Sequence, residues 1–246
     1  AARGRRRRRP GGAVWSSAGC VVERRPGAGW VVTPRIGKPV EISALWYNAL
    51  RIMADLARQL GQPADEYQDM AERTKKGFQR FWHTKAGHCY DVLDGPEGDD
   101  LALRPNQLLA ASLPHSPLTT RQRHQVVDAC ARALLTSHGL RSLAPDHPDY
   151  IGHYGGDRRQ RDGAYHQGTV WGWLIGPFIS AHLHAYEDRL AAQRFLRPLL
   201  IHLTGHGVGS ASEIFDGDAP FTPRGCPAQA WTVAELLRVW HLIQDR

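Results

Sequence analysis

The sequence predicts an all-α domain, and three features of its 246 residues support that prediction. Apolar residues recur three or four positions apart through most of the chain, as they do on one face of a helix. Strict alternation of apolar and polar residues, which marks half-buried strands, is nearly absent. Long loops rich in Gly, Asp and Pro separate the helical segments without a recurring local signature, which favours an α/α toroid with its long loops at one mouth over a solenoid.

The first predicted helix, residues 41–60, shows this pattern clearly. Apolar side chains recur at helical spacing from Ile42 to Leu60, and Gly61 and Pro63 then end the helix. Thr119 is expected to cap the start of a later helix. With these, about seven helices are predicted, over residues 41–60, 65–82, 105–113, 119–138, 168–186, 188–203 and 228–242.

Strands are expected in two short segments only, residues 30–34 and 89–93. The connections between helices are uneven, with long loops at residues 85–104, 140–165 and 205–227. Loops of that length in a helical domain more often build a site than connect helices passively. We therefore look for functional residues in them.

The formal net charge of +7 is concentrated at the beginning of the chain. Residues 1–30 contain eight arginines and one acid, which accounts for the whole excess and leaves the remainder neutral. The run Arg5 to Arg9 could contact phosphates or act as a nuclear address, but no basic surface extends it. We expect residues 1–29 to be a disordered Arg/Gly-rich segment that comes from out-of-frame translation or a wrongly placed start, and we expect no nucleic-acid partner.

No apolar run reaches the length of a membrane helix and no secretory signal is evident, so a soluble cytoplasmic protein without a membrane partner is expected. The four cysteines form no Cys-x-x-Cys pair, which favours reduced thiols. Two histidine pairs have spacings that could hold zinc, but no zincin glutamate accompanies them. We expect no metal and no cofactor. These pairs are His182 with His184 and His202 with His206.

Four segments combine aromatic, amide and charged side chains beside Gly or Pro. They cover residues 33–50, 103–114, 161–178 and 209–231. Sugar rings stack on Trp and Tyr, and their hydroxyls bind amides and carboxylates, so these segments indicate a carbohydrate site. Each residue taken singly also fits core packing, a loop ion pair or a helix cap. Four such clusters in one chain favour the site.

Five ordered motifs closely resemble the C-terminal half of bacterial and archaeal glycogen debranching enzymes, from about Trp30 to the end of the chain. They are Thr-Pro-Arg-x-Gly-Lys-Pro-Val-Glu-Ile from Thr33, Arg-Pro-Asn-Gln from Arg104, Tyr-His-Gln-Gly-Thr-Val-Trp from Tyr165, Ser-Glu-Ile-Phe-Asp-Gly from Ser212 and Arg-Gly-Cys-Pro-Ala-Gln-Ala-Trp from Arg224.

The resemblance implies an (α/α)6 barrel of the six-hairpin glycosidase type, of which residues 30–246 would form the C-terminal part. Apolar helix faces should then be exposed where further helices belong. It also implies hydrolysis of α-1,6-linked glucose at branch points of glycogen or an α-glucan, by two carboxylic acids and with inversion at the anomeric carbon.

Glu213 matches the general base of that family. We expect hydroxyl donors from Ser210 and Ser212 to keep it ionised. The family's general acid is an Asp in a Trp-Met-Asp segment shortly before Thr33, and residues 11–30 contain no Asp. Glu23 does not match that context, so the chain alone is expected to be inactive or nearly so.

Ten further residues are candidates for substrate contacts. Two alternatives stay open from the sequence: a non-catalytic glucan-binding module, and another α-glucosidase on the same barrel, similar to a glucoamylase or trehalase. The candidates for hydroxyl contacts are Arg35, Glu41, Asn48, Asn106, Asp162, His166 and Arg224, and those for stacking are Trp46, Tyr165 and Trp171.

Overall fold

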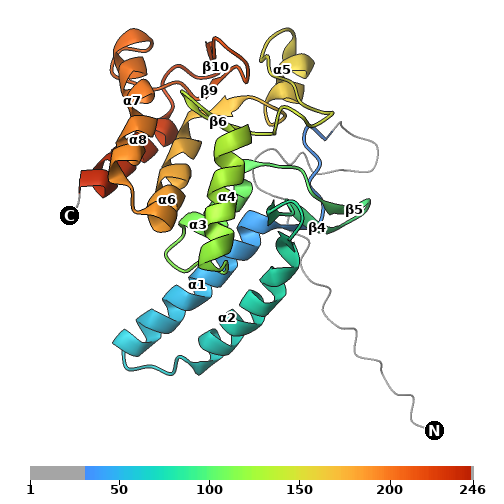
Figure 1. Cartoon of the computed structure of the whole chain (residues 1–246), viewed down its shortest axis with the longest axis vertical. Coiled ribbons are helices and arrows are strands. Elements are labelled where there is room, and N and C mark those ends of the chain that lie inside the picture. The colour runs from blue at the N-terminus through green and yellow to red at the C-terminus, as the bar shows by residue number, and fades with distance from the viewer. Residues whose placement is uncertain (1–30, 245–246) are drawn as a thin grey trace.

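The computed structural model describes residues 31–244, and the expectations for residues 1–29 lie outside that range. The all-α prediction is confirmed, because helices make up most of the described chain (Figure 1). Eight α-helices lie in this range. They are α1 (Val40–Gln59), α2 (Asp65–Phe78), α3 (Leu108–Ser112), α4 (Thr120–Ala133), α5 (Arg158–Ala164), α6 (Ile175–Tyr186), α7 (Arg189–Gly205) and α8 (Ala230–Gln244).

Three helix predictions need correction. The helix predicted over residues 119–138 ends at Ala133, because a strand of residues 135–136 follows it. Helix α5 was not predicted, because only Ala164 of its seven residues is buried and no apolar period marks it. A capping box between Asp157 and Gln160 starts it instead. The helix predicted from Gly168 begins only at Ile175, since a strand and a short 3-10 helix, η3 (Gly172–Leu174), precede it.

The structure also contains more strands than the sequence predicts, all of them short and antiparallel. Residues 31–34 form no strand, whereas residues 89–93 contribute to β3 and β4. Three small sheets have the orders β1-β4-β5, β2-β3 and β10-β9-β8-β7-β6. The strands are β1 (Lys38–Pro39), β2 (Trp82–His83), β3 (His88–Cys89), β4 (Val92–Gly95), β5 (Gly98–Asp100), β6 (Leu135–Thr136), β7 (Gly139–Arg141), β8 (Val170–Trp171), β9 (Ile214–Phe215) and β10 (Pro223–Arg224).

The five-stranded sheet joins loops that lie far apart in the sequence. Strand β8 pairs with β7 on one side and with β9 on the other, and Trp171 lies opposite Ile214. Strands β6, β9 and β10 and helix α5 lie at the end of the molecule opposite the tip of the α1–α2 hairpin (Figure 1). The sheet therefore brings the segments around residues 165–171 and 213–215 together.

Helix α6 lies at the centre of the core. It contacts α3, α4, α7 and α8, and Ile175, Phe178 and Ile179 are fully buried. Because almost all faces of α6 are covered, its sequence is apolar all round rather than amphipathic. Phe215 of β9 belongs to the same core, so the sheet is fixed to the helices beneath it.

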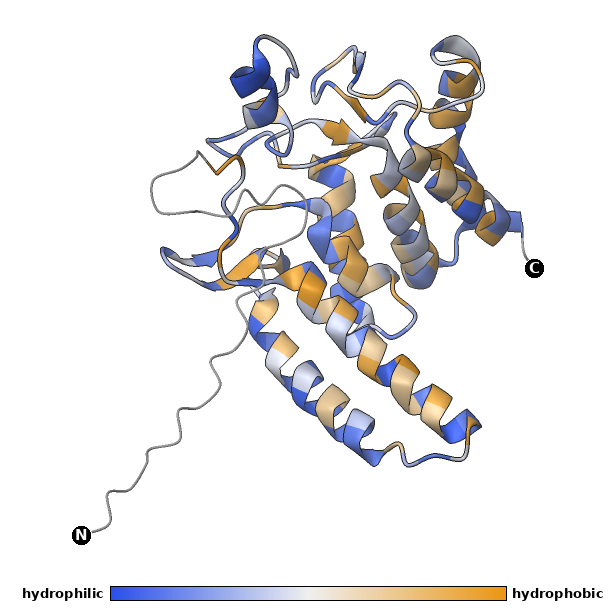
Figure 2. Ribbon diagram, turned by 180° about the vertical axis from the view of Figure 1, so that it is seen from behind, coloured by the Kyte–Doolittle hydropathy of each residue, from blue (hydrophilic) through white to orange (hydrophobic). Residues whose placement is uncertain are grey.

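Two helices have exposed apolar faces, as expected for part of a larger barrel. The hairpin of α1 and α2 projects from the molecule, and apolar residues follow the length of α1 (Figure 2). The exposed large apolar residues are Leu45, Trp46, Ile52, Met53, Leu56 and Leu60 on α1, and Trp231, Leu237 and Trp240 on α8. These side chains are 39–75% exposed in the part of the chain that the structure describes.

Two glycine substitutions should have opposite effects on stability. Gly139 has a φ of +139°, and a Cβ there would lie 2.3 Å from the carbonyl oxygen of Trp171. We expect Gly139→Ala to lower the free energy of unfolding by about 1–3 kcal/mol. Gly77→Ala, in open space within α2, should raise it by about 0.5–1 kcal/mol. Urea unfolding measures both, and equal effects would contradict the close approach of β7 to β8.

Candidate active site

Glu213 lies in the loop between α7 and β9, and backbone hydrogen bonds fix the loop on both sides. The Glu213 amide donates to the carbonyl of Cys226 at 2.9 Å, and its carbonyl accepts from Gly172 at 3.3 Å. The preceding amide, that of Ser212, donates to Nε2 of His202 on α7 at 3.2 Å. The backbone of Glu213 is therefore held between β8, β10 and α7.

Three donors meet the Glu213 carboxylate. The backbone amide of Cys226 donates to Oε2 at 3.0 Å, Nε2 of Gln229 donates to Oε1 at 3.3 Å, and the Tyr165 hydroxyl donates to the same Oε1. The expectation that the hydroxyls of Ser210 and Ser212 donate to Glu213 was wrong. Neither hydroxyl bonds to Glu213 in the described structure. Oγ of Ser212 is buried without a hydrogen-bond partner among the described residues. Two fixed oxygens with donors on each suit a carboxylate that accepts a proton.

Aromatic rings form the wall next to Glu213. The rings of Tyr165 and Trp171 lie 4.7 Å apart, and Nε1 of Trp171 donates to the Tyr165 carbonyl at 3.0 Å. His166 stacks on Trp171 with ring centroids 5.0 Å apart and planes 3° apart. Three of the predicted contact residues therefore pack together beside Glu213.

His166 is a neutral histidine within this group. Burial, and then the positive charges of Arg104 and Arg35, lower its pKa to about 4, and the charge of Glu213 opposes this only partly. Its Nε2 is buried and has no hydrogen-bond partner in the described part of the chain. An unpaired ring nitrogen in a buried place is energetically costly, and a hydrogen bond from a ligand hydroxyl would relieve that cost.

A buried set of charged side chains lies on the other side of His166. Both terminal nitrogens of Arg35 donate to the carboxylate of Glu41, at 2.7 and 2.9 Å, and Nε donates to Asp91 at 2.5 Å. Nδ2 of Asn106 donates to the other Asp91 oxygen at 2.8 Å. Burial alone disfavours the charged form of Arg35, but the hydrogen bond to Glu41 and the two carboxylates raise its pKa.

Asp91 was not predicted, although it binds two predicted residues, Arg35 and Asn106. Only 3% of its surface is exposed. It lies between β3 and β4 in the segment predicted as a strand, where an Asp indicates a turn rather than a site. Gln229 was also not among the candidates, because an amide in a loop is commonly explained by a nearby backbone group.

Arg224 of β10 lies opposite Ile214, the residue after Glu213, but its side chain pairs with Asp216 and not with Glu213. It pairs with Asp216 at 3.0 Å, and Asp216 also accepts from the backbone amide of Tyr154 at 2.9 Å and lies 3.3 Å from Nδ1 of His153. Burial acts to raise the pKa of Asp216, but its hydrogen bonds to Arg224 and Tyr154 lower it overall. This acid is therefore held as an ion-pair partner of Arg224.

Three predicted contact residues lie apart from Glu213. Trp46 is 51% exposed on α1. The Asn48 side chain accepts from the backbone amide of His115 at 3.1 Å. Asp162 pairs with Arg158 at 3.6 Å on the surface of α5. No contact with Glu213 or its three donors is seen for these side chains within residues 31–244.

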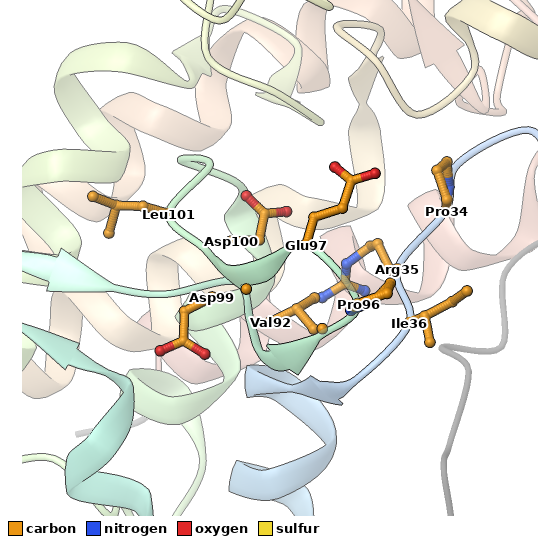
Figure 3. A pocket seen from close by; sticks show the side chains of 11 residues that line it. Pro34, Arg35, Ile36, Val92, Pro96, Glu97, Asp99, Asp100 and Leu101 are labelled. Carbon is orange, nitrogen blue, oxygen red and sulfur yellow. The ribbon is translucent and has the colours of Figure 1, made fainter.

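A cavity of about 350 Å³ lies between residues 34–36 and the β4–β5 hairpin. Figure 3 shows Pro34, Arg35 and Ile36 on one side and the hairpin on the other. Its floor is mixed in character, with Val92 and Leu101 beside acidic residues of the hairpin. Glu213 and its donors do not line it, and Arg35 links it to the buried charged set.

The sequence profile of a family described as amylo-alpha-1,6-glucosidase matches residues 25–238. The chain belongs to the amylo-alpha-1,6-glucosidase family. The resemblance found in the five motifs is thereby confirmed at the level of the family. The glycogen debranching enzyme of Saccharomyces cerevisiae is 23% identical over 268 residues, which cover 87% of this chain and 17% of the yeast enzyme.

Solved structures share the fold at low identity. An uncharacterized conserved protein from Thermus thermophilus is 20% identical, with a TM-score of 0.59 over 82% of this chain and 46% of that chain. A GH63 mannosylglycerate hydrolase from the same organism is 19% identical, with a TM-score of 0.59 over 83% of this chain and 47% of that chain. Neutral trehalase from Saccharomyces cerevisiae is 15% identical, with a TM-score of 0.60 over 84% of this chain and 38% of that chain.

These likenesses confirm the predicted architecture, part of an (α/α)6 barrel of the six-hairpin glycosidase type. The chain spans less than half the length of each of these solved proteins. By its description, the family to which the chain belongs is a glycosidase family. No helix within residues 31–244 is long and apolar enough to cross a membrane. No cluster of three or more His, Cys, Asp or Glu in that range could hold a metal ion.

The low pKa of His166 predicts a change in stability with pH. Between pH 6.5 and about 4 the unfolded chain binds a proton at this position and the folded chain does not, so acidification destabilises the fold. We expect His166→Gln to lose less stability than the native chain when urea unfolding is compared at pH 6.5 and pH 4.5. An equal loss in both proteins would contradict a neutral, buried His166.

Proposed function

We propose that this family domain hydrolyses α-1,6-glucosidic bonds at branch points of glycogen or a related α-glucan, with Glu213 as the general base. The observation that carries the proposal is the Glu213 carboxylate itself, which is held by Tyr165, Gln229 and the Cys226 amide beside an aromatic wall. The family description and the name of the yeast relative support the substrate class.

In the proposed mechanism Glu213 accepts a proton from a water molecule. That water attacks the anomeric carbon on the face opposite the leaving oxygen, and a second carboxylic acid protonates the leaving oxygen, so the configuration is inverted. His166, Trp171 and Tyr165 would contact the glucose ring, with Nε2 of His166 bonding to a hydroxyl. Arg224 and the buried set around Arg35 would fix the surrounding loops.

Neither Glu41 nor Asp91, the buried carboxylates that bind Arg35, is suited to supply the second acid. Glu41 accepts two hydrogen bonds from Arg35, and Asp91 accepts from Arg35 and Asn106, so their oxygens are engaged as acceptors. We therefore propose that this chain alone hydrolyses glucan slowly or not at all, because loss of a general acid typically lowers a rate by roughly 10²- to 10⁴-fold.

Glu213→Gln tests the proposed role of the base. In a fusion of residues 30–246 with the N-terminal half of a homologous debranching enzyme, we expect glucose release from a limit dextrin to fall by roughly 10²- to 10⁴-fold while the affinity for the dextrin changes little. Glu72→Gln, an exposed carboxylate on α2, is the matched control and should keep full activity. Unchanged turnover in Glu213→Gln would contradict the assignment.

A non-catalytic glucan-binding module is the second candidate, and it is favoured because no second acid is found beside Glu213 within residues 31–244. Such a module would bind a branched dextrin without turnover in any variant, fused or not. Another α-glucosidase of the same fold is distinguished by product analysis on α-1,4-, α-1,6- and α,α-1,1-linked substrates. We also propose a cytoplasmic location, which is supported by free thiols at Cys89, Cys130 and Cys226.

A further inference from the structure

Arg104 is a buried arginine to which the proposed mechanism gives no role. It follows β5 and directly precedes Pro105, which restricts it to an extended backbone, with φ −123° and ψ 159°. Only 7% of its surface is exposed. Its side chain therefore points into the protein from a fixed backbone position.

The guanidinium group of Arg104 joins two segments of the site. Nη1 donates to the carbonyl of Ser142 at 3.1 Å and to that of His166 at 2.7 Å, and Nη2 donates to Oε1 of Gln167 at 2.6 Å. The Ser142 hydroxyl accepts from the Gly168 amide at 2.9 Å, which ties the same two segments again. Arg104 thus holds residues 166–167 against the end of β7.

The acidic residue Asp91 also helps to hold the Arg104 side chain in place. Asp91 lies 3.8 Å from its Nε, and Asp91 also binds Arg35 and Asn106. Burial lowers the pKa of Arg104, and the Asp91 carboxylate opposes that effect. A planar fork with several donors suits this position better than lysine, because one group must reach two carbonyls and an amide oxygen at once.

The segment that Arg104 holds carries the donor to Glu213. Tyr165 immediately precedes His166, and its hydroxyl bonds to Glu213 while its carbonyl accepts from Trp171. A shift of the His166 carbonyl would therefore move the Tyr165 hydroxyl and the His166 ring together. A displacement of about 1 Å in such a group can lower activity by roughly a hundredfold.

We propose that Arg104 is the positioning residue of the Glu213 site: its guanidinium group fixes the Tyr165–Gln167 segment so that the Tyr165 hydroxyl meets the Glu213 carboxylate. The inference rests on the proposed function only in calling Glu213 the base. Removal of Arg104 alone also leaves two carbonyls and the Gln167 amide oxygen without their donor and is expected to lower stability, so the test measures the position of Tyr165 as well.

Crystal structures of Arg104→Met and Arg104→Lys test the proposal directly. We expect the Tyr165 hydroxyl to leave hydrogen-bond distance of Glu213 in Arg104→Met and to be displaced less in Arg104→Lys. Glucose affinity, measured by calorimetry, should fall roughly tenfold to a hundredfold in Arg104→Met and fall less in Arg104→Lys. Arg80→Met, an exposed arginine paired with Asp94, is the matched control and should change neither.

A double-mutant cycle separates positioning from general stabilisation. If Arg104 acts through Tyr165, the losses of glucose affinity in Arg104→Met and Tyr165→Phe will not add in the double variant. The proposal is overturned if the Tyr165 hydroxyl is still bonded to Glu213 in Arg104→Met. If Arg104→Met does not fold, the proposal is overturned when this bond is unchanged in Arg104→Lys and the affinity losses of Arg104→Lys and Tyr165→Phe are additive. Absence of glucose binding in the native chain would contradict the proposed function and leave the crystallographic result decisive for Arg104.

Discussion

The antiparallel pairing of β8 with β9 is the constraint on which the site depends. Each strand has only two residues, yet Val170 and Phe215 at their contact are fully buried in the helical core. Glu213 directly precedes β9, and the Tyr165 to Trp171 segment leads into β8. A carboxylate from one long loop and an aromatic wall from another therefore meet at a register set by core packing, which is more rigid than a contact between two free loops.

Buried charged side chains determine the electrostatics around His166 and Glu213. Arg35 and Arg104 are both buried near His166, and Glu41 and Asp91 balance their charge. Burial, and then the charges of the two arginines, lower the pKa of His166, so a neutral ring with an unpartnered nitrogen lies beside Glu213 rather than a second cation that would pair with it. The base is left with neutral donors, which orient it without competing for the proton that it must accept.

Sequence patterns predicted the helices well where one face is buried and poorly elsewhere. Helix α1 was predicted within one residue at each end, because its period and its Gly61 stop are local signals. The apolar run around Trp171 was assigned to a helix, since periodicity cannot separate a short buried strand from helix. Tyr165 was a candidate for stacking, but its bond to Glu213, 48 residues away, follows from the β8–β9 pairing and not from any local pattern.

A crystal structure of the chain with bound glucose tests the central claim most directly. Glucose is the sugar unit of the proposed substrate, which makes it a suitable probe. The account predicts a glucose ring against Trp171 and Tyr165, with a hydroxyl bonded to Nε2 of His166 and Glu213 within reach of the anomeric carbon through one water molecule. Glucose bound instead in the cavity between residues 34–36 and the β4–β5 hairpin, with Glu213 uninvolved, would contradict it.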